Sequence, residues 1–60
     1  MANLEIRMEM YEAGIKHYEL AEKIGISPFT LSVWLRTELT GERLERAQKA
    51  VGELKAEKKN

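Results

Sequence analysis

The helical pattern of this chain is clearest in residues 14–36, which read GIKHYELAEKIGISPFTLSVWLR. Gly25 is a stop signal, because glycine takes a positive φ at the end of a helix without strain. The Ser-Pro pair at residues 27–28 is a start signal, since serine caps a helix and proline suits its first turn. The stretch therefore predicts one short helix over residues 17–24 and a second over residues 28–36.

Apolar residues in this stretch have the spacing of two helices that pack across a tight turn. A small residue at Ala21 lets the helices approach each other, and Gly25 provides the positive φ that the turn needs. The full set of core and turn positions is Leu20, Ala21, Ile24, Gly25, Ile26, Leu31 and Trp34. Because these positions all fit at once, residues 17–36 are predicted to form a helix-turn-helix.

A further helix is predicted before this unit. Asn3 is a good N-cap and Gly14 is a stop signal, and the apolar residues between them recur at helical spacing. We expect these side chains to form one widened stripe that faces the core: Leu4, Ile6, Met8, Met10, Tyr11 and Ala13. The opposite face is expected to be a solvated acidic stripe rather than a docking surface, and it consists of Glu5, Glu9 and Glu12.

One longer helix is predicted after a connector at residues 37–40. Its apolar stripe repeats at helical spacing and consists of Leu44, Ala47, Val51 and Leu54. Gly52 weakens the middle of this helix by about 1 kcal/mol relative to alanine, which leaves a bend or a division there open. The helix is expected to span residues 41–57, with a frayed basic tail over residues 55–60. The sequence thus predicts a single all-α domain over residues 1–60, a compact bundle of four or five helices.

Composition weighs against catalysis and against a bound cofactor or metal. The chain has 60 residues with one histidine, His17, and neither cysteine nor aspartate. A chain of this size buries only about 60% of the surface that its unfolded form exposes, so it hardly encloses a catalytic cleft. The lack of cysteine fits a reducing compartment, and no apolar run approaches the roughly 20 residues of a membrane span. We therefore expect a cytoplasmic protein without enzyme activity, cofactor, metal, membrane partner or small-molecule substrate.

Charge is distributed unevenly along the chain although the formal net charge is zero. Residues 1–22 carry two basic and five acidic side chains, whereas residues 23–60 carry eight basic and five acidic ones. DNA binding draws its sequence-independent affinity from lysine and arginine at phosphates. The zero net charge therefore disfavours DNA, whereas the basic second part of the chain favours it.

The stretch from Gly14 to Arg36 resembles the Cro and lambda-repressor-like family of helix-turn-helix domains, particularly the small members of phages and mobile elements. The resemblance implies a sequence-specific DNA-binding regulator whose second motif helix enters the major groove. It also implies a dimer on a palindromic operator, and a repressive or other regulatory role for a phage or mobile element.

Three features of the chain depart from that family's pattern. The first motif helix opens with Lys16 and His17, where the family often has a serine or threonine cap and a glutamine. Met10 and Leu35 stand where the family often pairs an arginine with a glutamate, and packed apolar residues are a reasonable replacement for a buried ion pair. The chain after Arg36 is short, with room for one long helix or two short ones.

The helix at 28–36 has two distinct faces. At about 100° per residue, Leu31, Trp34 and Leu35 share the side that faces the core. The opposite side presents the candidate base-reading residues, which are Phe29, Ser32, Val33 and Arg36. Arginine can contact guanine O6 and N7, serine can bond a base edge, and apolar side chains can contact thymine methyl groups. An alternative is that Arg36 only caps the helix and Phe29 folds back over Ile26.

Phosphate contacts are expected from polar residues around this helix. The candidates are Lys16, His17, Ser27, Thr30, Thr37 and Arg43. Lys16 and His17 stand at the start of a helix, where unpaired N–H groups and the helix dipole favour an anion. His17 is equally consistent with an ordinary surface residue.

Two further expectations concern protein partners. An exposed Phe29 and Val33 are also typical of a protein-binding face, so the alternative function is an antirepressor-like or adaptor module that uses the same helix. A homodimer is expected because one short recognition helix buries little surface. The apolar stripe of the 41–57 helix is longer than a small core can cover. Val51 and Leu54 are therefore predicted to form the dimer interface.

Overall fold

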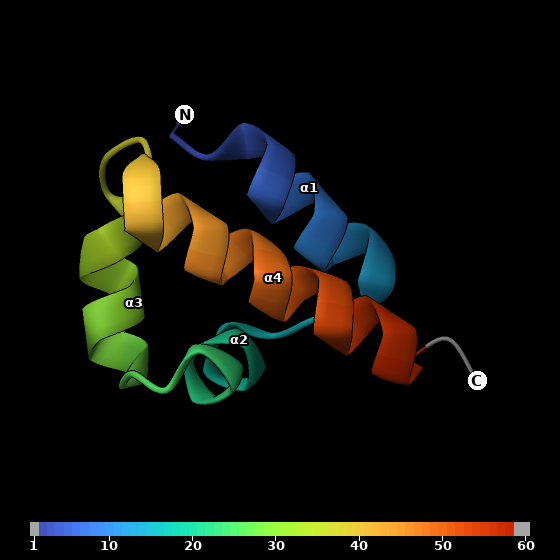
Figure 1. Ribbon diagram of the computed structural model, residues 1–60. Coiled ribbons are helices and arrows are strands. Elements are labelled where there is room, and N and C mark those ends of the chain that lie inside the picture. The colour runs from blue at the N-terminus through green and yellow to red at the C-terminus, as the bar shows by residue number, and fades with distance from the viewer. Residues whose placement is uncertain (1, 59–60) are drawn as a thin grey trace.

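The computed structural model describes residues 2–58, which form four helices (Figure 1). The helices are α1 (Leu4–Ala13), α2 (His17–Ile24), α3 (Pro28–Leu35) and α4 (Gly41–Lys58). The described residues contain no strand, so the all-α class is confirmed. None of these four helices is long and apolar enough to cross a membrane.

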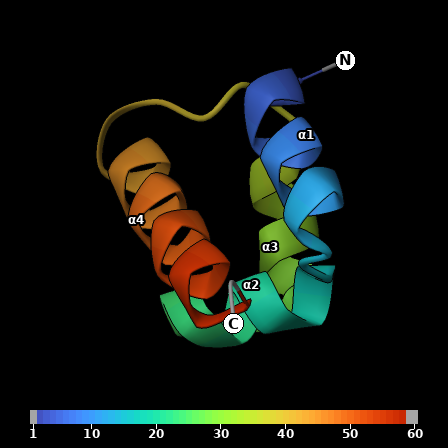
Figure 2. The same cartoon turned by 90° about the vertical axis from the view of Figure 1, so that its right-hand side faces the viewer.

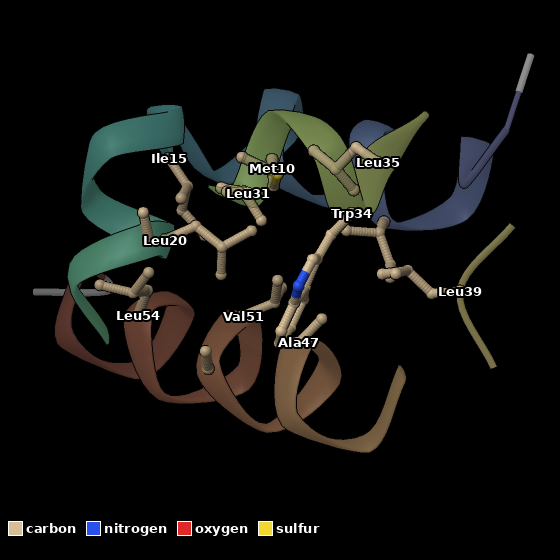
Figure 3. Close-up of a cluster of buried hydrophobic side chains, with 13 residues drawn as sticks. Met10, Ile15, Leu20, Leu31, Trp34, Leu35, Leu39, Ala47, Val51 and Leu54 are labelled. Atoms are coloured by element: carbon tan, nitrogen blue, oxygen red, sulfur yellow. The ribbon is translucent and has the colours of Figure 1, made fainter. Parts of the chain in front are cut away.

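The long helix α4 closes one side of the molecule. It packs against α1 and α2, and α2 packs in turn against α3. Figure 2 shows α4 on one side, α1 and α3 on the other, and α2 across the base. Side chains from all four helices fill the space between them (Figure 3), and the largest fully buried ones are Leu20, Leu31, Leu35 and Val51.

The turn between α2 and α3 forms as its local sequence predicts. Gly25 has φ 97°, and its N–H donates to the carbonyl oxygen of Ala21 at 2.9 Å. The Ser27 Oγ atom accepts the N–H of Thr30 at 3.1 Å, and Pro28 occupies the first position of α3. A stop signal followed directly by a start signal thus limits the connection to three residues and sets the direction of α3.

Asn3 occupies the N-cap position of α1 as expected, but its side chain makes no capping hydrogen bond. Its backbone is left-handed, with φ 60°, and its side chain is 3% exposed. The amide nitrogen donates to the carbonyl oxygens of Leu35 at 3.2 Å and Thr37 at 2.9 Å. The amide oxygen accepts the N–H of Leu39 at 2.8 Å. Asn3 therefore joins the start of α1 to the connector between α3 and α4, and the sequence prediction of an N-cap was wrong about what the side chain binds.

Helix α1 carries apolar residues on two opposite sides, and only one side reaches the core. Ile6 and Met10 are buried, whereas Leu4, Met8 and Tyr11 are exposed. The expectation of one widened inward stripe was wrong for these three side chains. A helix on the surface of a small domain can turn only one face toward the core, and the i, i+4, i+7 set that begins at Leu4 lies on the other face.

Helix α4 runs without a break through Gly52, and its apolar stripe is covered within the single chain. Val51 and Leu54 are 2% and 7% exposed. The prediction that these two residues form a dimer interface was wrong, because α1 and α2 pack over α4 and leave neither side chain at the surface.

Residues 55–58 are helical rather than frayed as expected. The Nζ atom of Lys55 lies 3.3 Å from Glu9 Oε1, and that of Lys58 lies 3.1 Å from Glu19 Oε2. These ion pairs attach the end of α4 to α1 and α2. The rest of the expected tail, residues 59–60, lies outside the described residues.

The buried position of Val51 and Leu54 leads to a first prediction. Changing both to lysine should unfold the chain rather than dissociate a dimer, because each loss of a buried aliphatic costs about 2 kcal/mol or more and the introduced charges add to it. A small domain has only about 5 kcal/mol of stability to lose. Circular dichroism should show the helical signal collapse, whereas Gln48→Lys on the exposed side of α4 should keep it. A folded double variant would contradict this assignment.

A second prediction concerns Asn3. Replacing it with alanine should lower the free energy of unfolding by about 2–4 kcal/mol, because buried backbone groups of the connector lose their partners. Urea denaturation checks this. Asn3→Gly is the control, since glycine accepts the left-handed backbone freely but makes no side-chain hydrogen bond. Stability within about 0.5 kcal/mol of the parent chain in both variants would show that these bonds contribute little.

Candidate nucleic-acid interface

The outer face of α3 carries the four residues that were expected to read bases. Phe29 is 75% and Val33 41% exposed, and Ser32 and Arg36 are exposed beside them. The opposite face of α3 is buried through Leu31, Trp34 and Leu35. The alternative placement of Phe29 over Ile26 does not occur, because three quarters of the phenyl side chain is open to solvent. The face offers one cation, one hydroxyl and two apolar groups.

The start of α2 already holds an anion. Lys16 and His17 are exposed there, and the Lys16 N–H donates to Glu19 Oε1 at 2.8 Å. This backbone hydrogen bond, followed by the bond from the Lys58 ammonium, holds the pKa of Glu19 below its ordinary value. A phosphate bound by Lys16 and His17 would lie beside this carboxylate. The α2 N-terminus is therefore a poorer anion site than the sequence alone indicates.

The hydroxyl groups at the start of α3 are unequal as phosphate donors. The Ser27 hydroxyl accepts the Thr30 N–H and donates to Thr30 Oγ1 at 2.9 Å, so its hydrogen is used within the helix. Among the described residues, the Thr30 hydroxyl accepts this hydrogen bond and donates none. Thr37 is exposed just after α3, and its carbonyl oxygen is held by Asn3. Thr30 and Thr37 are thus better placed to donate to a phosphate than Ser27.

Two arginines of α4 lie against the tryptophan of α3. The guanidinium carbons of Arg43 and Arg46 are 5.1 and 5.5 Å from the centroid of the Trp34 ring, within cation–π range. Arg46 also donates to the carbonyl oxygen of Ile24, the last residue of α2, at 3.1 Å. Arg43 was predicted as a phosphate ligand, but Arg46 was missed. Its signal is the i, i+3 spacing from Arg43, which places both on one side of α4.

The basic side of α4 continues past these arginines. A shallow hollow of about 250 Å³ beside the end of α2 is lined by Lys23, Arg46, Lys49 and one acid, Glu53, among others. Lys23 bonds Glu57 in an ion pair, which raises the pKa of its ammonium. We call Arg43, Arg46 and Lys49 the α4 basic edge. It lies beside the end of α2, and its two arginines lie over the Trp34 ring, on the inner side of α3.

No family model, curated protein or solved structure matches this chain. What the protein binds is therefore inferred from its own side chains. The exposed face of α3 carries a mixture of apolar and polar groups, and the α4 basic edge carries three cations near Trp34 and the end of α2.

Proposed function

We propose that this protein is a small sequence-specific DNA-binding regulator in which α2, the three-residue turn and α3 act as a helix-turn-helix. The observation that carries the proposal is the exposed outer face of α3, which ends at Arg36, together with the cations of the α4 basic edge near Trp34 and the end of α2. An α-helix fits the major groove of B-DNA, and lysine and arginine beside it neutralise phosphates. The resemblance of residues 14–36 to phage and mobile-element regulators supports the same function.

Each side chain of the outer α3 face has a defined role in this proposal. Arg36 makes a bidentate contact to guanine O6 and N7, and Ser32 bonds a base edge. Phe29 and Val33 contact thymine methyl groups. The exposure of all four side chains supports these roles, since none must leave the core to reach a base.

Phosphate contacts hold the protein in register on the duplex. The α4 basic edge contributes Arg43 and Arg46, which lie over Trp34 of α3, and Lys49, which lies beside the end of α2. Thr30 and Thr37 add hydroxyl donors at the two ends of α3. Lys16 and His17 contribute less, because the Glu19 carboxylate lies at the same helix end.

The proposed binding unit is a homodimer on a palindromic site. A single module of this size buries only about 600–1,000 Å² on DNA, and two modules one helical turn apart, about 34–36 Å, provide the affinity that regulators need. Because Val51 and Leu54 are buried, the two copies meet through another surface or only on the DNA itself.

A second candidate function is supported by the exposure of Phe29 and Val33. Two large apolar side chains on one exposed helix face are typical of protein-binding sites. In this alternative the chain is an antirepressor-like or adaptor module that presents α3 to another protein. The α4 basic edge has no role in that alternative, so removing its charges distinguishes the two functions.

The third prediction is that the chain binds duplex DNA with a steep dependence on salt. Contacts to about four to six phosphates per subunit give a slope of log K against log[salt] of about −3.5 to −5.5, since each neutralised phosphate contributes about −0.9. Fluorescence anisotropy with random duplexes at several salt concentrations measures this slope. Changing Arg43, Arg46 and Lys49 to glutamine should flatten it. An absence of binding at tens of micromolar in low salt would sink the DNA proposal and leave the protein-binding alternative.

The fourth prediction concerns Arg36, which is exposed at the end of α3. Arg36→Ala should keep the helical content and weaken binding to a duplex selected from a random library by about 1–3 kcal/mol, with relaxed preference at one base pair. Lys55→Ala is the matched control, because it removes a cation on the α1 side of α4. Equal weakening on all sequences would assign Arg36 to a phosphate, and unchanged affinity would remove it from the interface.

A further inference from the structure

Helix α1 carries an exposed apolar ridge that the proposed DNA-binding surface does not use. Leu4, Met8 and Tyr11 are 55%, 53% and 88% exposed, and their i, i+4, i+7 spacing aligns them on one side of the helix. We call these residues the α1 ridge. The core side of the same helix is formed by Ile6 and Met10, and the ridge lies outside the buried cluster.

A groove lies directly beside this ridge. A hollow of about 420 Å³ between α1 and the start of α4 is lined on its apolar side by Leu4, Met8, Leu39 and Leu44. It shares Glu9 and Gln48 with a second hollow of about 790 Å³ that continues along α1 and α4. Leu4 and Met8 of the ridge line the first hollow, between two helices that pack together (Figure 1). The second hollow is lined mainly by charged and polar side chains, which include Lys55 and Lys58.

The part of the groove next to the ridge is negatively charged. Its lining contains the carboxylates of Glu5, Glu9 and Glu38, and it contains no lysine or arginine. Glu9 is paired with Lys55 and Glu38 accepts the N–H of Asn3, whereas Glu5 is exposed on the rim. The acidic stripe of α1 therefore borders an apolar groove rather than lying alone in solvent.

We infer that this groove docks a basic amphipathic helix of a partner protein. An amphipathic helix places aliphatic side chains at i, i+3 and i+4 into a groove between helices, and its lysines or arginines meet the acidic rim. Charge disfavours the other occupants. DNA would be repelled by the carboxylates, and a twofold pairing of two α1 ridges would bring the same acidic rim from both copies together. The inference does not depend on DNA binding by α3.

The test uses two synthetic helical peptides of about 18 residues with the same leucine stripe. One carries lysine on its polar face and the other carries glutamate. Titration of each into the ¹⁵N-labelled full chain should show at least tenfold tighter binding of the lysine peptide. Shifted resonances should be those of α1, the connector before α4, and the first turns of α4. Equal affinity for the two peptides, or shifts centred on α3, would overturn the proposal.

Variants of the exposed residues separate the groove from a general charge effect. Leu4→Ser with Met8→Ser should weaken the lysine peptide at least tenfold while the chain stays folded, because both side chains are exposed. Tyr18→Ser, which removes an exposed aromatic side chain from α2, is the matched control and should leave affinity within twofold. Glu5→Lys should weaken the lysine peptide and strengthen the glutamate peptide. Unchanged affinity in the double variant, or self-association through the ridge in light scattering, would refute this docking site.

Discussion

Burial of Leu20, Leu31 and Val51 between three helices is the contact on which the rest of the structure depends. Helices α2 and α3 are eight residues each, too short to persist in water without packing. Helix α4 packs its apolar stripe against α2 and α1 and closes this core. Because the inner face of α3 packs into this core, its outer face is exposed to solvent. Asn3 holds the connector that follows α3.

Ion pairs between helices shape the charge of the folded surface. Lys55 and Lys58 are paired with Glu9 and Glu19, so two cations of the basic second part of the chain are matched to acids of the first part. Arg36 is exposed at the end of α3 and Arg43 and Arg46 lie over Trp34, whereas Glu5 stays exposed next to the α1 ridge.

Local signals explain what the sequence could predict. Gly25 and the Ser27–Pro28 pair act on their immediate neighbours, so the bounds of α2, the start of α3 and the outward residues of α3 follow from them. Other features depend on distant contacts. Helix α1 has two apolar sides, and only the position of α4 decides which is buried. Asn3 binds residues more than thirty positions away, and the burial of Val51 and Leu54 depends on α1 and α2.

We propose that α3 and the α4 basic edge together bind DNA. Nuclear magnetic resonance titration of the ¹⁵N-labelled full chain with a short duplex at low salt tests it most directly. We expect the largest shifts on Phe29, Ser32 and Arg36, with further shifts on Arg43 and Arg46 and none on the α1 ridge. Shifts centred on α1, or a spectrum unchanged by excess duplex, would rule out DNA binding through α3.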